Sequence, residues 1–100
     1  MANLIKLADI AQREFEDSAL WYTRVSETVR QNFIDEVYKA FDAISRNPEF
    51  YPKKKGKNRE YVLRKFRFVV VYEFLPKEDS VYILHVFHTS RHPKHKYKRN

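Results

Sequence analysis

Hydrophobic and polar positions in the first half of the chain repeat with the period of an α-helix. Asp9, followed by Gln12 three residues later, has the pattern of a capping box, and it predicts that a first helix begins there. Beyond it, intervals of four, four and three residues separate a set of apolar residues, which therefore share one helix face. This set is Ala11, Phe15, Ala19 and Tyr22.

A second helix is predicted by a longer apolar repeat. Its members are spaced by four, four, three and four residues, and Asn47-Pro48 ends the pattern because a residue before proline disfavours the helical conformation. The joint between the two helices falls near residues 25–27, which is short enough to predict an antiparallel helical hairpin. The repeating residues are Val29, Phe33, Val37, Ala40 and Ile44.

The second half changes to the pattern of β-strands. Runs of β-branched and aromatic residues predict strands over 59–64, 66–75 and 80–87, and the turn at 76–80 makes the last two a hairpin. Residues 53–58, KKKGKN, are expected to form a polar connection. With a short strand at 3–7, the order is β-α-α-β-β-β, which is an α+β fold of two layers: an N-terminal strand, an antiparallel helical hairpin and a three-stranded antiparallel meander.

Length and composition narrow the class of protein. One hundred residues predict a single domain over 1–100, and 43% hydrophobic residues exclude a disordered polar chain. Cysteine is absent, the four histidines lack a metal-ligand spacing, and no apolar run is long enough to cross a bilayer. The sequence also lacks a signal-peptide pattern. We therefore expect a cytoplasmic protein without metal, cofactor or membrane.

Charge is divided unevenly between the halves. Residues 1–50 contain 6 Lys and Arg against 9 Asp and Glu, whereas residues 51–100 contain 14 against 4. Residues 91–100 form a basic tail with five cations and no acid. This asymmetry predicts a positive region that attracts an anionic partner. The alternative is a basic end that serves only solvation.

Four phrases follow one another along the predicted elements. They are A-x-x-E-F…W-Y over 11–22, I-S-R-N-P over 44–48, R-K-F-R-F-V-V-V-Y over 64–72 and V-F-H-T-S-R-H-P over 86–93. In these phrases and their order, the chain resembles the RelE/ParE superfamily of toxins from bacterial type II toxin–antitoxin modules. Arg67 and Phe68 depart from this pattern, because the family phrase has proline and tyrosine there.

The resemblance implies a helical hairpin packed on an antiparallel sheet, with the first strand beside the last. It also implies one of two activities. Some members cut messenger RNA in the ribosomal A site without a metal, and others poison DNA gyrase without nuclease activity. A cognate antitoxin silences both kinds, so an acidic or amphipathic antitoxin segment is the expected partner.

The positions that correspond to the catalytic residues of the superfamily's nucleases favour one of the two activities. The two catalytic lysines of those relatives fall on Glu60 and Val62, and their central-strand arginine falls on Val69. Three other positions carry over, namely Arg64, Arg91 and Tyr97. Because the lost positions are the cations held most firmly on strands, the resemblance favours a gyrase poison over a ribosome-dependent nuclease.

The candidate site residues lie in the basic half, and each has a structural alternative. Arg91 is either the central contact or the salt-bridge partner of Glu14 or Asp17; His88 is either an acid–base group or a packed strand end. For the other cations the alternative is solvation, and for Trp21 and Tyr22 we expect core packing. The target- and antitoxin-binding candidates are Arg64, Arg67, Arg91, His92, Lys54 and Lys55, and the catalytic candidates of a nuclease are Arg91, His88, Tyr97 and Arg64.

Two other functions fit the same composition. A non-toxic nucleic-acid-binding module would use the basic half for phosphate contacts and its interleaved aromatic residues for stacking. A protein-interaction scaffold that has lost toxicity is the other. Growth arrest on induction separates the toxin from both.

Overall fold

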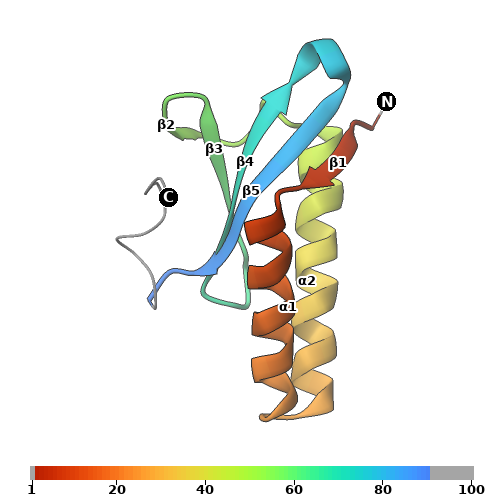
Figure 1. Ribbon diagram of the computed structural model, residues 1–100, viewed down its shortest axis with the longest axis vertical. Helices are drawn as coiled ribbons and strands as arrows, with labels where there is room; N and C mark the ends of the chain where they lie inside the picture. Colours follow the sequence, from red (N-terminus) through yellow and green to blue (C-terminus); the bar gives the residue numbers. More distant parts are fainter. Residues whose placement is uncertain (1, 91–100) are drawn as a thin grey trace.

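The computed structural model describes residues 2–90. Two helices pack on one face of a sheet, and the chain order is that of the predicted α+β fold with one further short strand, Lys53–Lys55, ahead of the meander (Figure 1). The elements are β1 Leu4–Leu7, α1 Asp9–Thr23, α2 Glu27–Arg46, β2 Lys53–Lys55, β3 Asn58–Val62, β4 Phe68–Leu75, the one-turn 3-10 helix η1 Pro76–Glu78 and β5 Ser80–His88.

The sheet has five strands in the order β1-β5-β4-β3-β2. β3, β4 and β5 form the predicted antiparallel meander, and the first strand lies beside the last, with β1 parallel to β5. In the pairing of β4 with β5, Tyr72 lies opposite Ile83, whereas the preceding residue, Val71, lies opposite His85. Leu84 is therefore the extra residue of a β-bulge.

The helical hairpin follows the predicted pattern at most of its ends. The Ser26 hydroxyl accepts the N–H of Val29 at 3.0 Å and caps α2, which ends at Arg46, just ahead of Asn47-Pro48. The predicted capping box at Asp9 is wrong. Ala8 occupies the N-cap, and its side chain has no oxygen that could accept an N–H of the first turn. The Ala8 N–H donates to the carbonyl of Ile83 on β5 at 2.9 Å, so the hydrogen bonds of the strand reach as far as the N-cap.

The main core lies between the hairpin and the sheet. Phe33, Val37, Ala40 and Ile44 are fully buried, as the helical repeat predicts. They pack with apolar side chains of β4 and β5, and with Tyr22 at the rim of the core. The prediction that Trp21 packs in the core is wrong, because its side chain is 47% exposed.

The lysine-rich segment is a strand rather than a connection. Lys53 pairs with Arg59 and Lys55 with Asn58, so β2 and β3 form a hairpin at the edge of the sheet. Gly56 makes the turn with a φ of 57°, a left-handed conformation that glycine adopts readily because it has no Cβ. Within residues 2–90, neither helix is long and apolar enough to cross a membrane.

Candidate interaction surface

Arg64, Arg67 and His88 lie at the same end of the sheet. The β3–β4 turn at residues 63–67 is closed by the Leu63 N–H, which donates to Phe68 at 3.0 Å. β5 ends beside this turn, because the Thr89 N–H donates to the carbonyl of Arg67 at 2.8 Å. Both arginine side chains are exposed. The turn therefore presents two guanidinium groups next to the end of β5.

His88 is held in place by backbone and aromatic contacts. Its Nδ1 accepts the N–H of Ser90 at 3.1 Å, and its ring meets Phe68 edge-on with 5.2 Å between centroids. A neutral ring that accepts at Nδ1 carries its proton on Nε2. His88 is therefore a packed residue at a strand end, which is one of the two alternatives predicted from the sequence. It lies next to the turn that carries Arg64 and Arg67.

Three of the candidates, Arg91, His92 and Tyr97, lie outside the described residues. Their convergence with Arg64 therefore remains a prediction. The Thr89 N–H donates to the carbonyl of Arg67, so the chain reaches Ser90 at the end of the sheet where Arg64 and Arg67 lie. We call this end the arginine end of the sheet.

Lys54 and Lys55 are on a different surface. They belong to β2, whose hairpin with β3 lies at the beginning of β3, whereas Arg64 follows the end of β3 (Figure 1). The two lysines and Arg64 therefore lie at opposite ends of β3. The sequence-predicted cations are therefore divided between two ends of the sheet rather than gathered at one site.

The three positions at which the nuclease cations are lost, Glu60, Val62 and Val69, share one face of the sheet, the face away from the helices. Val62 pairs with Val69, and Glu60 pairs with Val71, so their side chains point to the same side. Val69 and Glu60 are buried, at 3% and 6% exposure, and Val69 packs with Phe87. Among these positions there is no cation, and one residue is an acid.

One interaction that sequence reasoning missed joins α1 to β5. The Glu14 carboxylate accepts the backbone N–H of Val86 at 2.9 Å and lies 3.3 Å from Nδ1 of His85. Glu14 was identified only as part of the first helix phrase and as a possible partner of Arg91. Across residues 2–90, no group of three or more His, Cys, Asp or Glu side chains is arranged to hold a metal ion.

Solved structures of toxin–antitoxin systems share this fold. The chromosomal ParDE system of P. aeruginosa superposes with a TM-score of 0.74 at 10% identity, covering 87% of this chain and 96% of that one. The intact E. coli RelBE complex gives 0.64 at 16% identity, with 87% and 96% covered. The RelBE2 complex of Mycobacterium tuberculosis gives 0.58 at 15% identity, with 88% and 92% covered. At such identities the likeness shows the fold alone.

Family membership rests on the sequence. Among curated proteins, none matches the chain significantly. The family described as the ParE toxin of the type II toxin–antitoxin system parDE matches residues 5–93, which include both helices and nearly all of the sheet. The chain therefore belongs to the ParE toxin family of type II toxin–antitoxin systems.

Proposed function

We propose that this ParE-family toxin stops growth by poisoning DNA gyrase and that a cognate antitoxin neutralises it. One observation carries the choice of target. The sheet face that bears the catalytic cations in the matched nucleases presents Glu60, Val62 and Val69 here.

The chemistry of RNA cleavage explains why this face matters. Cleavage without a metal needs a base for the 2′-hydroxyl, an acid for the leaving 5′-oxygen and cations for the crowded phosphate. Valine side chains at positions 62 and 69 supply none of these groups. A carboxylate at position 60 repels a phosphate instead of stabilising it. A toxin that acts by binding needs none of this chemistry.

The arginine end of the sheet is the proposed contact surface for the target. Arg64 and Arg67 are exposed on one turn beside His88, and Arg91 follows three residues after His88 in the sequence. Guanidinium groups bind carboxylates or phosphates in two-pronged fashion, and lysine does not reproduce that geometry. A complex of gyrase with cleaved DNA offers both kinds of anion.

The antitoxin is the second proposed partner. ParDE and RelBE proteins of this fold are complexes of a toxin with its antitoxin. We place the antitoxin's acidic or amphipathic segment over the exposed Arg64 and Arg67 and propose that Arg91 belongs to the same surface, where opposite charge speeds the encounter. Neutralisation then follows from occlusion of the same groups that contact the target.

Induction of the toxin in growing cells tests the choice of target. We expect DNA breaks that remain covalently linked to gyrase, together with intact messenger RNA. Codon-spaced cuts within translated regions, mapped by primer extension, would instead identify a ribosome-dependent nuclease.

The nuclease is retained as the second candidate because of His88. Its ring lies at the end of β5 beside the turn that carries two arginines, and an imidazole that has taken up a second proton is a general acid next to phosphate-binding groups. His88→Ala separates the candidates. A gyrase poison keeps most of its toxicity in this variant, whereas a nuclease that uses the imidazole loses about 100-fold or more of its cleavage rate.

A further inference from the structure

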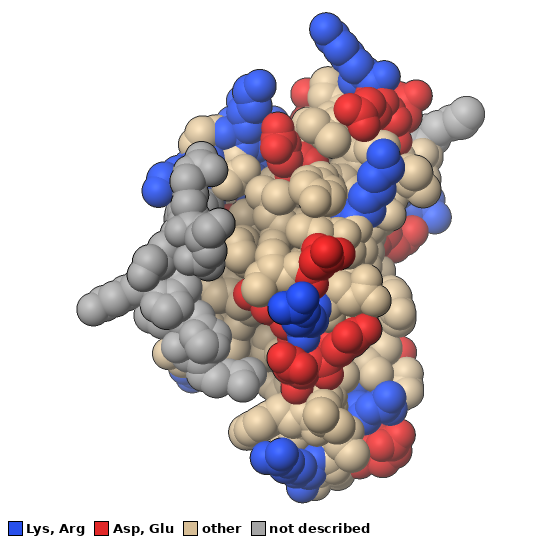
Figure 2. All heavy atoms as spheres, viewed as in Figure 1, with Lys and Arg blue, Asp and Glu red and all other residues tan. Residues whose placement is uncertain are grey.

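A second basic surface lies on the β2–β3 hairpin, at the end of β3 away from Arg64. Residues 53–59 contain five cations and no acid, and β2 is the last strand of the sheet. Every residue of β2 is an exposed lysine. Lys and Arg side chains project from this region, at the upper left of Figure 2. From this arrangement we infer that the hairpin binds the phosphate backbone of duplex DNA.

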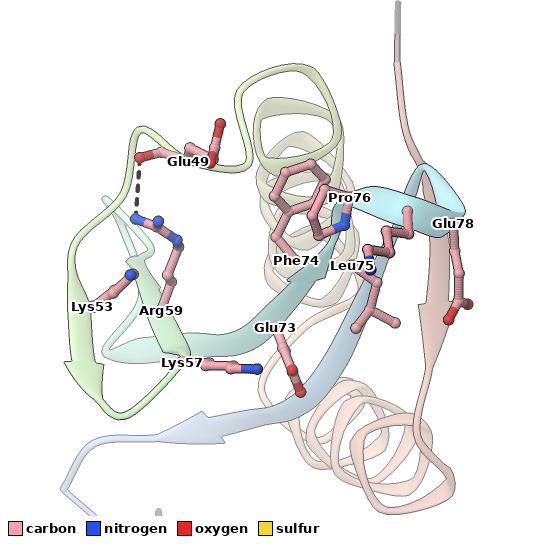
Figure 3. A pocket seen from close by; sticks show the side chains of 10 residues that line it. Glu49, Lys53, Lys57, Arg59, Glu73, Phe74, Leu75, Pro76 and Glu78 are labelled. Atoms are coloured by element: carbon pink, nitrogen blue, oxygen red, sulfur yellow. Dashed lines mark hydrogen bonds between the residues drawn. The ribbon is translucent and has the colours of Figure 1, made fainter.

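Arg59 gives the hairpin a cation in a fixed position. Its Nη1 donates to the carbonyl oxygen of Tyr51 at 2.7 Å and to that of Glu49 at 3.1 Å. Figure 3 shows the second of these bonds. Neutral carbonyl groups hold the guanidinium without cancelling its charge. The lysines around it are point charges on flexible stems, which adapt to phosphates at different positions. The hairpin thus combines one anchored cation with several adaptable ones.

The hollow beside the hairpin argues against an acidic peptide as the ligand. It has a volume of about 520 Å³ and lies between the hairpin and the end of β4 with η1. Phe74 contributes to its apolar lining, and its charged lining residues are of both signs, namely Glu49, Glu73 and Glu78 with Lys53, Lys57, Arg59 and Lys77. Lys57 points towards Glu73 (Figure 3), and the Glu78 carboxylate lies 3.7 Å from the Lys6 ammonium. Because these carboxylates partly balance its cations, the hollow attracts an acidic peptide less than the outer edge does, where residues 53–59 include no acid. The outer edge of the hairpin therefore favours a polyanion that needs no apolar anchor.

The spacing of the lysines suits a nucleic-acid backbone. A strand rises about 3.3 Å per residue, so the backbone of the three lysines of β2 spans about 7 Å. Lys53 pairs with Arg59 and Lys55 with Asn58, which are successive residues of β3, so these two lysines project from opposite faces of the hairpin. Duplex DNA carries one negative charge per about 1.7 Å of its axis, so a duplex that lies along the outer edge of β2 places phosphates within reach of the long lysine side chains on both faces. Such contacts hold DNA without reading its sequence. Binding is therefore expected to be independent of sequence and steeply dependent on salt.

Binding of a short duplex of mixed sequence, followed by fluorescence anisotropy over a series of salt concentrations, tests this inference. The variant Lys54→Glu with Lys57→Glu is compared with Arg13→Glu with Lys39→Glu, which reverses the same number of exposed charges on the helices. We expect the hairpin variant to bind at least about tenfold more weakly at low salt. The slope of log K against log salt should become shallower by about two. The helix variant should stay within about twofold of the native chain.

Three results would overturn the inference: no binding by the native chain, an equal loss in both variants, or tighter binding of single-stranded RNA than of duplex DNA. The neutral variant Lys54→Gln with Lys57→Gln guards against misfolding, and its affinity should fall between those of the native chain and the reversed variant. Because gyrase is absent from this assay, its outcome is independent of the proposed target. A toxin that binds DNA but leaves gyrase unaffected would refute only the proposed function.

Discussion

The carboxylate of Glu14 on α1 takes the place of a missing strand beside Val86 on β5. β1 pairs only with residues 80–83, so the rest of this edge of β5 faces α1. There the Glu14 Oε1 accepts the Val86 N–H at 2.9 Å, which a neighbouring strand would otherwise satisfy. One side chain thereby fixes the first helix against the sheet at a position where the backbone ladder has ended.

We predict that Glu14→Ala lowers the free energy of unfolding by about 1–3 kcal/mol, because it leaves a partly buried N–H without its acceptor. Glu14→Gln keeps a carbonyl oxygen at this position and should lose less. Urea denaturation measures both. Asp17→Ala, an exposed change on the same helix, is the control and should stay within about 0.5 kcal/mol. If Glu14→Ala proves as stable as this control, the contact does not contribute to stability.

Phe33→Ala should cost about 3–5 kcal/mol, because the ring is fully buried and its removal leaves a cavity. The ring centroid lies 4.7 Å from that of Phe68 and 5.0 Å from that of Tyr22. A domain of this size has a total stability of about 5–10 kcal/mol, so the variant should be severely destabilised. Thermal melting gives the answer, with the exposed change Asn32→Ala on the same helix as its control. A drop of only a degree or two would contradict the burial of Phe33 between the hairpin and the sheet.

Helical periodicity predicts the hairpin well because burial against the sheet selects one face. The same reasoning fails at Trp21, since a residue next to a buried position on a helix need not share its face. Asp9 with Gln12 resembles a capping box. However, the hydrogen bonds between the N-terminal strand and β5 extend to the N–H of Ala8, and Ala8 occupies the N-cap in place of Asp9. Local pattern is overridden in that case by a tertiary hydrogen bond.

The lysine strand shows a different limit. Lys53–Lys55 has low strand propensity, and its pairing with β3 depends on the turn at Gly56 rather than on its own side chains. The sequence therefore predicted its charge correctly and its conformation wrongly. For the same reason, the separation of Lys54 from Arg64 depends on the pairing of β2 with β3, which the side chains of residues 53–55 do not encode.

Tyr72 predicts a loss of stability at high pH. Its hydroxyl donates to the carbonyl of Pro48 at 2.7 Å, and burial raises its pKa to about 12. In the unfolded chain the group titrates near pH 10, so between pH 10 and about 12 the folded state holds a proton that the unfolded state has lost. The contribution is complete below pH 10 and is lost as the pH rises towards 12.

Tyr72→Phe tests this account by urea denaturation on both sides of pH 10. The variant should be less stable at neutral pH by about 1–3 kcal/mol, because the buried carbonyl of Pro48 loses its donor. It should also lose less stability than the native chain above pH 10. Some alkaline loss remains in the variant, since burial raises the pKa of Tyr61 as well. Parallel pH profiles for the two proteins would refute the assignment to Tyr72.

Reversal of the arginine surface should slow association with the antitoxin. The variant Arg67→Glu with Arg91→Glu replaces attraction by repulsion at the proposed docking surface, so its on-rate at low salt should fall by about tenfold or more. The on-rate should also lose most of its dependence on salt. Stopped-flow mixing of the refolded toxin with its antitoxin provides the measurement. An on-rate equal to that of the native chain at low salt would move the docking site elsewhere.

Arg91→Ala separates a functional arginine from a structural one. If Arg91 contacts the target, the variant should lose growth inhibition while its melting temperature stays within a few degrees of the native value. A structural Arg91 paired with Glu14 or Asp17 predicts the reverse: marked destabilisation, with toxicity retained per folded molecule. Glu14 already accepts the Val86 N–H and lies against His85, so its carboxylate is engaged with β5. Growth curves after induction, read together with the melting temperature of the purified variant, therefore decide between the two roles, and we expect the loss of toxicity.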